Sequence, residues 1–340
     1  MRNALPALGL VAAALLVPAC RDEARGPDAR AASPRPYAIG IFQSVDSPTG
    51  AEVRRGILQA FAAAGLRDGR DIVVSIRIAN NDIAEVQRIA RELAAGGADL
   101  IMPLSTQALQ AAIRTAGRVP IVFGAVAVPY LVGAGQSADD HRPNVTGVVS
   151  TGPVRETVAL IREVLPRARR LGSLWTSSEV NSESYLEEAR AAAADLGFEL
   201  AAVPVTGTHE IQGALQRLLN GRIDALFPMS DNTVNSAFDL VGRAAEENGI
   251  PLFASFLKSV ESGACAALGY DFHELGVRAG ELAVRVMNGE RPARIPFRSP
   301  GAVRLYLNTA AAARQGVVFP APLLARAART FSAPPGPGSD

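Results

Sequence analysis

Asp99–Ser105 reads DLIMPLS and Asp224–Ser230 reads DALFPMS, so Asp, Pro and Ser recur at the same places 125 residues later. Each stretch is a short apolar run that opens on an acid and ends on polar residues, which is typical of a buried strand that enters a turn. The next apolar run of each half also repeats, because Pro120 precedes IVF and Pro251 precedes LFA. A period this long indicates two similarly folded lobes rather than a solenoid.

Short apolar or β-branched runs alternate with Ala/Leu/Arg-rich helical stretches from Tyr37 onward. This alternation predicts an α/β protein with two Rossmann-like lobes, each a parallel sheet flanked by helices. In the first half we expect strands at 37–42, 71–79, 98–104 and 119–126, and helices at 52–66, 83–97 and 106–116. In the second half a single helix is expected at 233–249, directly after the SDN turn.

The N-terminus carries an export signal. Arg2 precedes an apolar run, Ala4–Ala19, that suits a signal peptide and ends LVPAC, which resembles the lipobox of bacterial lipoproteins. We therefore expect a signal peptide at 1–19, a lipid on Cys20 and a flexible tether through residue 36. Pro18 departs from the commonest lipobox, which keeps an ordinary signal peptide cut elsewhere as the alternative. The end of the chain, 323–340, is expected to be a tail.

Composition excludes several classes of function. The net charge is +1 with no long run of one sign, which argues against nucleic-acid binding. If Cys20 carries lipid, Cys265 has no partner for a disulfide, and its small apolar neighbours indicate a core residue. GxSxG, HExxH and CxxC motifs are absent and the three histidines have no metal-ligand spacing, so we expect no enzyme activity, metal or cofactor.

Polar side chains gather where the predicted strands end, which is the edge at which parallel α/β sheets bind ligands. Asp231 and Asn232 either bond a ligand or cap the following helix, and the same two interpretations apply to Asn181 and Ser182. Tyr130 and Phe256 would stack on a flat ligand. The candidate ligand-binding residues at strand ends are Ser44, Asp46, Ser47, Ser105, Thr106, Tyr130, Asn181, Ser182, Asp231, Asn232 and Phe256.

Residues 37–319 resemble one family. NVTG at 144–147, SDNTV at 230–234 and GYDFHELG at 269–276, in this order and spacing, resemble the ABC-transporter substrate-binding proteins of the TrpX-like type. The resemblance implies the type I periplasmic-binding-protein fold, in which a three-segment hinge lets two lobes close on a small solute. It also implies an ABC permease as partner, and amino acids, aromatic ones among them, as solutes.

The resemblance also implies the lobe boundaries. Residues 37–144 plus 271–292 would form lobe 1, and 145–270 plus 293–322 would form lobe 2. Asp271 lies where the chain crosses between lobes, so it would either bond the ligand or hold the hinge. Ala127 is a further candidate because Ala127-Val128-Pro129 stands where the family usually has Thr-Asp-Pro. Losing that acid and hydroxyl favours a less polar solute, or an amine held by Asp231 or Asp46.

We therefore expect a monomeric, exported, lipid-anchored receptor that faces the periplasm or the cell exterior and delivers a small solute to a permease. A ligand sensor of the same fold, coupled to a membrane signalling protein, is the alternative. The receptor's own residues do not separate the two.

Overall fold

The computed structural model describes Met1 and residues 35–332. The predicted signal peptide, the lipidated Cys20 and most of the tether fall on residues 2–34, outside the described residues, as does the segment 333–340.

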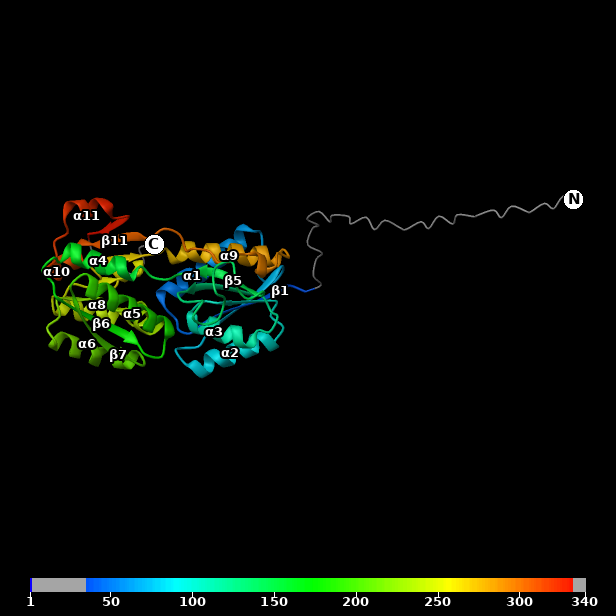
Figure 1. Cartoon of the computed structure of the whole chain (residues 1–340), viewed down its shortest axis with the longest axis horizontal. Coiled ribbons are helices and arrows are strands. Elements are labelled where there is room, and N and C mark those ends of the chain that lie inside the picture. The colour runs from blue at the N-terminus through cyan, green and yellow to red at the C-terminus, as the bar shows by residue number, and fades with distance from the viewer. Residues whose placement is uncertain (2–34, 333–340) are drawn as a thin grey trace. The chain divides into compact units, whose positions relative to one another are not determined.

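The first lobe is a parallel sheet with helices on both faces (Figure 1). Two helices that carry Val53, Ile57, Leu275 and Ala279 pack on one face, and two others cover the opposite face. Its elements are β1 (Tyr37–Gln43), α1 (Pro48–Ala63), β2 (Ile72–Ile78), α2 (Ile83–Ala95), β3 (Leu100–Pro103), α3 (Thr106–Thr115), β4 (Ile121–Val126), β5 (Val145–Val149), α9 (Phe272–Met287) and the 3₁₀ turn η3 (Pro292–Arg294). The strands run in the order β2-β1-β3-β4-β5.

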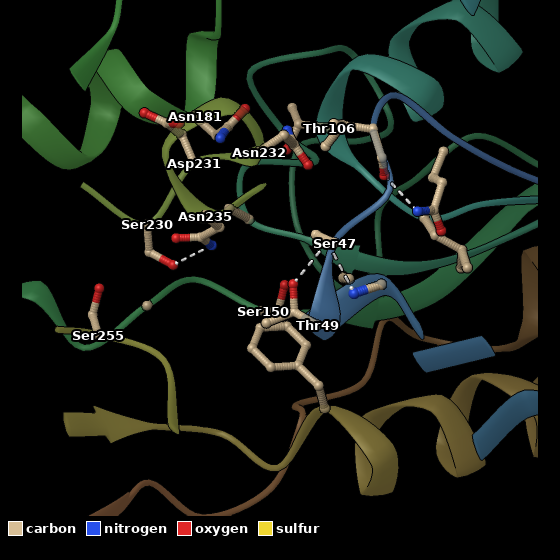
Figure 2. Close-up of a pocket in the computed structure, with 18 of the residues that line it drawn as sticks. Ser47, Thr49, Thr106, Ser150, Asn181, Ser230, Asp231, Asn232, Asn235 and Ser255 are labelled. Carbon is tan, nitrogen blue, oxygen red and sulfur yellow. Dashed lines mark hydrogen bonds between the residues drawn. The ribbon is translucent and has the colours of Figure 1, made fainter. Parts of the chain in front are cut away.

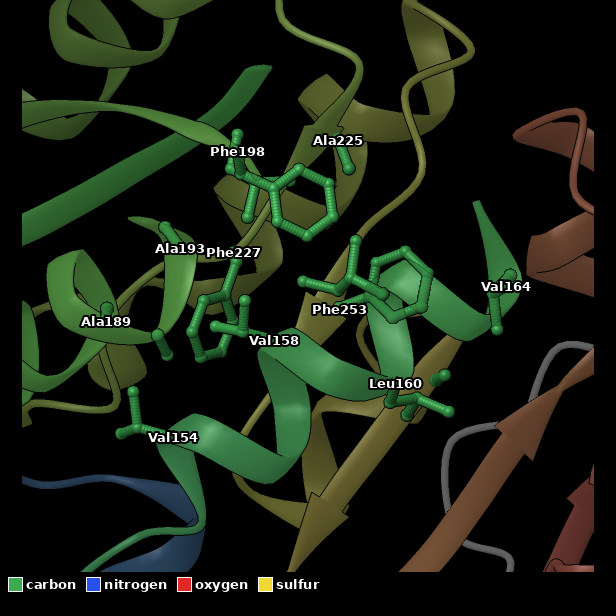
Figure 3. Packing of buried hydrophobic residues seen from close by; sticks show 14 of the residues in the cluster. Val154, Val158, Leu160, Val164, Ala189, Ala193, Phe198, Ala225, Phe227 and Phe253 are labelled. Atoms are coloured by element: carbon green, nitrogen blue, oxygen red, sulfur yellow. The ribbon is translucent and has the colours of Figure 1, made fainter. Parts of the chain in front are cut away.

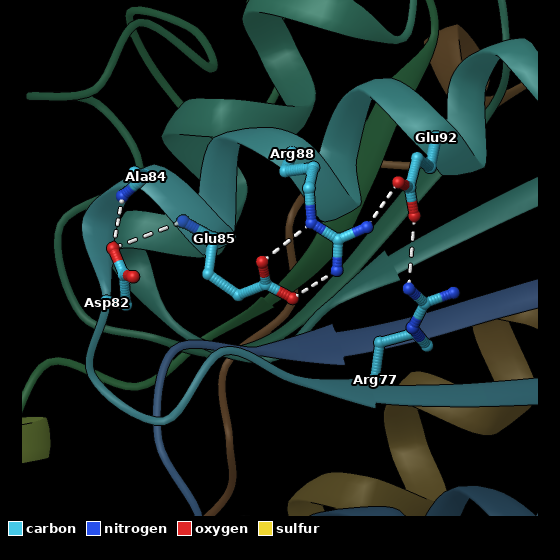
Figure 4. Close-up of polar contacts among 6 residues, drawn as sticks. All are labelled: Arg77, Asp82, Ala84, Glu85, Arg88 and Glu92. Carbon is cyan, nitrogen blue, oxygen red and sulfur yellow. Dashed lines mark hydrogen bonds and ion pairs between the residues drawn. The ribbon is translucent and has the colours of Figure 1, made fainter.

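Local chemistry fixes where α2 begins and how it lies on the sheet edge (Figure 4). The Asp82 carboxylate accepts hydrogen bonds from the backbone N–H groups of Ala84 and Glu85, at 2.8 and 3.3 Å. Arg88 pairs with Glu85 and Glu92 along the same helix, and Arg77 on β2 reaches Glu92 at 3.0 Å. The cap satisfies the otherwise unpaired first-turn N–H groups, and the ion pairs tie the helix to the edge strand.

The second lobe repeats this arrangement. Its strands are β6 (Arg170–Thr176), β7 (Glu199–Val205), β8 (Ala225–Leu226), β9 (Phe253–Ala254), β10 (Ala266–Gly269), β11 (Arg304–Asn308) and β12 (Arg329–Phe331). Its helices are α4 (Val154–Val164), α5 (Val180–Asp195), η1 (Thr208–Glu210), α6 (Ile211–Asn220), α7 (Asn232–Ser236), α8 (Phe238–Glu247), η2 (Leu257–Val260), α10 (Thr309–Arg314) and α11 (Ala321–Arg326).

One bridge joins the two strand groups of the second lobe. Leu226 pairs with Leu252, which places β8 beside β9 and gives the order β7-β6-β8-β9-β10-β11-β12. The first five of these strands repeat the order of the first lobe. The predicted fold class, two α/β lobes with parallel sheets flanked by helices, is confirmed.

In the core of the second lobe, phenylalanine side chains at the ends of the strands pack against α4 (Figure 3). Phe227 and Phe253 are fully buried and pack with Val158 of α4 and Phe198. Cys265 belongs to the same cluster, and burial raises the pKa of its thiol to about 12. The apolar strand ends that carry the repeat therefore anchor each sheet, while the polar residues that follow them are left for the cleft.

The first crossing between lobes lies later than the sequence predicted. Residues 145 onward were assigned to the second lobe, but Val145–Val149 forms β5 and pairs in parallel with β4. NVTG at 144–147 spans the predicted crossing, yet Asn144 donates to the carbonyl oxygens of Gly117 and Val119 and so holds the start of the strand. Gly147 is needed within it because a Cβ there would lie 2.4 Å from the Phe123 carbonyl oxygen.

The third crossing was also placed too early. Residues 293–298 were assigned to the second lobe, but the backbone N–H groups of Phe297 and Arg298 donate to the carbonyl oxygens of Ala138 and Gly147, in the first lobe. The Phe297 ring packs edge-on against Phe123 at 4.8 Å between centroids. The crossing therefore falls between Arg298 and the start of β11.

Two expectations for the second lobe were wrong. Residues 323–332 are not a tail, since Leu323 is fully buried in α11 and β12 pairs with β11. The expected helix 233–249 is broken, because the Ala237 N–H bonds the Val234 carbonyl one residue short of helical spacing and α7 ends there. Within residues 35–332, every helix is too short or too polar to pass through a bilayer.

Candidate functional site

A cleft lies where the carboxyl ends of the strands of both lobes face each other (Figure 2). Its lining comes from both lobes and from two of the crossing segments, as expected for parallel α/β sheets. The first lobe supplies Gln43, Val45, Ser47, Thr49, Gly50, Leu104, Thr106, Ala125 and Ala127; the crossings supply Ser150, Gly152, Tyr270 and Phe272; the second lobe supplies Asn181, Tyr185, Ser230, Asp231, Asn232, Asn235 and Ser255.

The structure divides the predicted site residues into three groups. Six line the cleft: Ser47, Thr106, Ala127, Asn181, Asp231 and Asn232. Three lie buried behind its lining, Ser44, Ser105 and Ser182. Ser44 donates to Ser105 at 3.1 Å, and Ser105 accepts from the Ala108 N–H as the cap of α3. Ser182 donates to Asp231 at 2.6 Å, so all three hydroxyls support the lining rather than belong to it.

Four predicted residues lie outside the cleft: Asp46, Tyr130, Phe256 and Asp271. Asp46 is mostly exposed and pairs with Arg54 at 3.1 Å. Tyr130 stacks on Phe297 at the surface of the first lobe, 5.9 Å between ring centroids. Phe256 is buried and packs edge-on against Phe238 at 4.9 Å.

Asp271 was predicted either to bond the ligand or to hold the hinge, and its hydrogen bonds fit the hinge. It caps α9 through the Glu274 N–H and accepts from Arg304 of β11 at 2.9 Å. Arg304 also reaches Glu274 at 2.8 Å, so one guanidinium joins the first turn of α9 to the second lobe.

Asp231 is the buried centre of the second lobe's side of the cleft. Its carboxylate accepts from the N–H and hydroxyl of Thr176, from Ser182, and from the Val234 N–H, at 2.6–3.0 Å. Burial, followed by the nearby Glu179 carboxylate, raises the pKa of Asp231 to about 8. Asp231 therefore caps α7, as one of its two interpretations predicted, and its carboxylate is already hydrogen-bonded by donors of its own lobe.

Glu179 is a site residue that the sequence analysis missed. It is 1% exposed at the start of α5, yet its carboxylate turns to the first turn of α7. It accepts from the N–H groups of Asn232 and Thr233, both at 3.0 Å, from both of their side chains, and from the Asn181 amide at 3.4 Å. The N-terminus of α7 is thus closed by two carboxylates and offers no anion site.

Three buried polar atoms of the second lobe's face have no hydrogen-bond partner among residues 35–332. They are Asn181 Oδ1, Asn235 Oδ1 and Ser255 Oγ, and all three residues line the cleft. A buried polar atom without a partner costs about 1–3 kcal/mol, so native proteins keep few of them. Two of the three are acceptors, which suits a ligand that brings N–H donors. No motif marked Asn235 or Ser255.

The first lobe faces these atoms with the N-termini of two helices. Ser47 caps α1 through the Gly50 N–H at 3.1 Å, and Thr49 and Thr106 lie in the first turns of α1 and α3. First-turn N–H groups have no partner within their helix and carry a partial positive charge. This side of the cleft therefore suits an anionic group such as a carboxylate.

The remaining walls are apolar and aromatic. Ala125, which has a positive φ of 52°, lies near the end of β4 where the ladder to β5 is irregular, and Ala127 follows the strand. The rings of Tyr185, Tyr270 and Phe272 also face the cleft. The Tyr185 hydroxyl is engaged, since it accepts from the Gly152 N–H and donates to the Ser150 carbonyl. In the described part of the chain, no group of three His, Cys, Asp or Glu residues could hold a metal ion.

Two similar α/β lobes, three crossings and a cleft of this composition define a two-lobed solute-binding protein of the periplasmic-binding class. A family model described as ABC transporter substrate binding protein matches residues 38–331. The chain belongs to that family, and the resemblance seen in the sequence is confirmed.

Individual relatives agree. A tyrosine-binding protein of Clostridioides difficile is 32% identical over 270 residues, 79% of this chain and 78% of the relative. A solved ABC domain in complex with L-Trp, from Streptococcus pneumonia, is 28% identical with a TM-score of 0.82. A ligand-free, open substrate-binding protein from Clostridium difficile is 30% identical with a TM-score of 0.65. Both structures cover 87% of this chain and are covered over 100% of their own length.

Proposed function

We propose that this protein is the extracytoplasmic receptor of an ABC importer and that it binds an amino acid with an aromatic side chain. The observation that carries the proposal is the pairing of the cleft's two faces. The second lobe presents three buried, unpartnered polar atoms, and the first lobe presents the N-termini of α1 and α3. An amino acid carries an ammonium group that would donate to the polar atoms of the second lobe, and a carboxylate that would accept from the helix N-termini of the first lobe.

The side-chain preference rests on the walls and on the relatives. Tyr185, Tyr270 and Phe272 give flat rings against which an aromatic side chain would pack. One relative is named a tyrosine-binding protein, and one similar solved structure contains L-Trp. The ammonium is held by Asn181, Asn235 and Ser255, which replaces the earlier assignment of an amine to Asp231 or Asp46.

Binding proceeds by closure of the lobes, because a ligand that touches both lobes stabilises the closed arrangement over the open one. This structure is more similar to the complex with L-Trp than to the open, ligand-free relative, at equal coverage. The Thr233 hydroxyl, which donates to Glu179, also lies 3.3 Å from Asn81 Oδ1 of the first lobe. These observations support a closed arrangement here, ready to dock on a permease.

The binding test titrates the purified chain with L-tyrosine and L-tryptophan by calorimetry. At about 100 times its dissociation constant, a bound solute should raise the free energy of unfolding by roughly 2.7 kcal/mol. Asn235→Ala should weaken binding at least tenfold, because a hydrogen bond to a charged group is worth about 1.5–3 kcal/mol.

Asn248→Ala is the matched control, since the Asn248 amide donates to the Ala244 carbonyl on α8, outside the cleft. Binding of neither amino acid, or equal effects of the two variants, would overturn the proposal. Recovery of the solute unchanged after incubation would separate a receptor from an enzyme.

We further propose that Cys20 carries the lipid that anchors the receptor, by the resemblance of LVPAC to a lipobox. Labelled palmitate should enter the wild-type chain in cells and be absent from Cys20→Ser. Because a single chain supplies the whole lining of the cleft, we propose a monomer as the binding unit.

A further inference from the structure

Glu179 has an arrangement that a helix cap alone does not require. It lies at the start of α5, its side chain caps none of the backbone N–H groups of that helix, and its carboxylate reaches the first turn of the neighbouring α7. Two of its donors are backbone N–H groups, which any acceptor would satisfy. Two others are the side-chain amides of Asn181 and Asn232, and both of these residues line the cleft.

The carboxylate decides which end of the Asn181 amide faces the cleft. An amide presents a donor at one end and an acceptor at the other, and its hydrogen-bond partners set its orientation. Each group that is hydrogen-bonded to the Glu179 carboxylate is a donor, and the Asn181 amide turns its nitrogen toward it, at 3.4 Å. The oxygen, Asn181 Oδ1, is then directed away, and it is buried without a partner among residues 35–332. Figure 2 shows Asn181 beside Asp231 and Asn232 on this face.

We propose that Glu179 is a positioning residue that makes the Asn181 amide present its oxygen to the cleft, and thereby selects solutes with an ammonium group. An amide without this partner could turn its nitrogen outward and donate to a carbonyl or hydroxyl oxygen instead. With Glu179 in place, such a turn would set an oxygen against a buried anion. A solute that has a hydrogen atom or an oxo group in place of the ammonium group on its α-carbon would leave Asn181 Oδ1 without a donor. The inference rests on the proposed function, because it names what the same site discriminates.

The test measures discrimination rather than affinity. The full chain is titrated with L-tyrosine and with 3-(4-hydroxyphenyl)propanoate, which lacks only the ammonium group, and with L-tryptophan and indole-3-propanoate. The readout is the ratio of the two dissociation constants in each pair. Glu179→Gln keeps the size of the side chain and an acceptor for α7, but its own amide can donate to Asn181. In this variant we expect the dissociation constant of the analogue, divided by that of the amino acid, to fall at least tenfold.

Glu210→Gln is the matched control. Glu210 also accepts from a backbone N–H of the second lobe, that of Thr206 at 2.7 Å, and lies outside the cleft. It should leave the ratio unchanged. A purely structural role for Glu179 would weaken both members of each pair equally, and an unchanged ratio in Glu179→Gln overturns the inference while leaving the proposed function intact. A wild-type chain that binds none of the four probes overturns the proposed function, and the inference with it.

Asn181→Ala keeps the test decisive if Glu179→Gln does not fold. This variant removes the oriented amide and leaves Glu179 its bonds from Asn232 and Thr233, so α7 stays capped. The ratio should narrow in Asn181→Ala as well. Full discrimination in this variant overturns the inference, whatever becomes of Glu179→Gln.

Discussion

Ser255 and Ser259 are buried serines four residues apart, and they differ in their hydrogen bonds. Ser259 is fully buried and its hydroxyl donates to the Phe256 carbonyl at 2.6 Å. Ser255 is 5% exposed and its hydroxyl has no partner in the described part of the chain. A satisfied hydroxyl contributes to folding, whereas an unsatisfied one costs stability and is retained where a ligand completes it.

We predict opposite effects of removing the two hydroxyls. Ser255→Ala should leave the free energy of unfolding unchanged or higher, and weaken amino-acid binding roughly 3- to 10-fold, the value of an ordinary hydrogen bond. Ser259→Ala should lower the free energy of unfolding by about 1 kcal/mol and leave binding unchanged. Urea unfolding without solute and calorimetric titration measure both quantities. Equal losses of stability in the two variants would contradict the assignment of Ser255 to the site.

Asp231 predicts a dependence of stability on pH. Its pKa is raised to about 8 by burial and by Glu179, so the folded chain keeps a proton that the unfolded chain releases near pH 4. Its contribution to the free energy of unfolding is therefore largest below about pH 4, falls as pH rises toward about 8, and is level above that.

Asp231→Asn isolates this contribution, because an asparagine cap is neutral at every pH. The difference in unfolding free energy, wild type minus variant, should decrease from pH 5 to pH 8 in urea titrations. An increase over this range would mean that the four donors to Asp231 outweigh burial, so that the carboxylate is already ionised.

At the scale of the residue, the sequence predicted part of the site. Position after a strand was enough to find Asn181, Asp231 and Thr106. It was not enough to choose between Ser255 and Phe256, because successive side chains of an extended segment point to opposite sides. The large ring went to the core and the small hydroxyl to the cleft. Glu179 was missed because most of its partners, those on Asn232 and Thr233, lie on a different helix.

At the scale of the element, α1 and α9 meet across more than 200 residues of sequence through glycines. A Cβ on Gly56 would lie 2.2 Å from the His273 carbonyl oxygen, and one on Gly276 would lie 2.2 Å from the Val53 carbonyl oxygen. Backbone therefore packs directly on backbone where the two helices cross. Because α9 returns to the first lobe after the chain has passed through β6 to β10 of the second lobe, this contact joins segments that are far apart in the sequence.

We predict that Gly56→Ala destabilises the chain by about 1–3 kcal/mol, because neither backbone can move away from the added methyl group without repacking. Gly213→Ala in α6 is the control, since a Cβ there meets only the tip of the Arg217 side chain at 3.9 Å. That change should stabilise the chain by about 0.4–1 kcal/mol through a less flexible unfolded state. Thermal and urea unfolding would measure both. A tolerated Gly56→Ala would mean that the crossing can loosen.

Hydrophobic periodicity and turn-forming residues predicted most helices and strands, but they did not predict where the chain crosses from one lobe to the other. NVTG spans the predicted crossing, yet Val145–Val149 forms β5, which pairs the backbone groups at the edge of β4. The same rule explains why 293–298 stays with the first lobe and why 329–331 adds a strand to the second. Such assignments depend on which edge is open in three dimensions.

At the scale of the whole molecule, closure depends on contacts that exist only when the lobes meet. Lys258 of the second lobe reaches Glu52 of α1 at 3.7 Å, and burial raises the pKa of Glu52. An ion pair of this kind is worth at most about 1 kcal/mol, but all of it favours the closed arrangement. Its effect should therefore appear in ligand affinity.

We predict that Lys258→Gln weakens amino-acid binding by up to about fivefold, and that the difference shrinks at high salt. Arg155→Gln is the control, since Arg155 pairs with Asp195 within the second lobe at 2.7 Å. That variant should bind as the wild type does. Titration at about 50 mM and 500 mM salt tests both variants. A salt-independent loss in Lys258→Gln would show that the lysine acts other than through charge.

The sequence by itself determined the fold class, the family and the strand ends at which the cleft forms. The fold class and the strand ends follow from local periodicity and from a repeat that each half carries within its own residues, and the family follows from the resemblance of NVTG, SDNTV and GYDFHELG. Only the tertiary structure decided which polar side chains face the cleft and where the chain crosses between lobes. Asn235 and Ser255 acquire their roles because folding buries their oxygens at the cleft without a partner in the described residues. Glu179 acquires its role from α7, and a hydrogen bond between distant segments leaves no period in the sequence that encodes it.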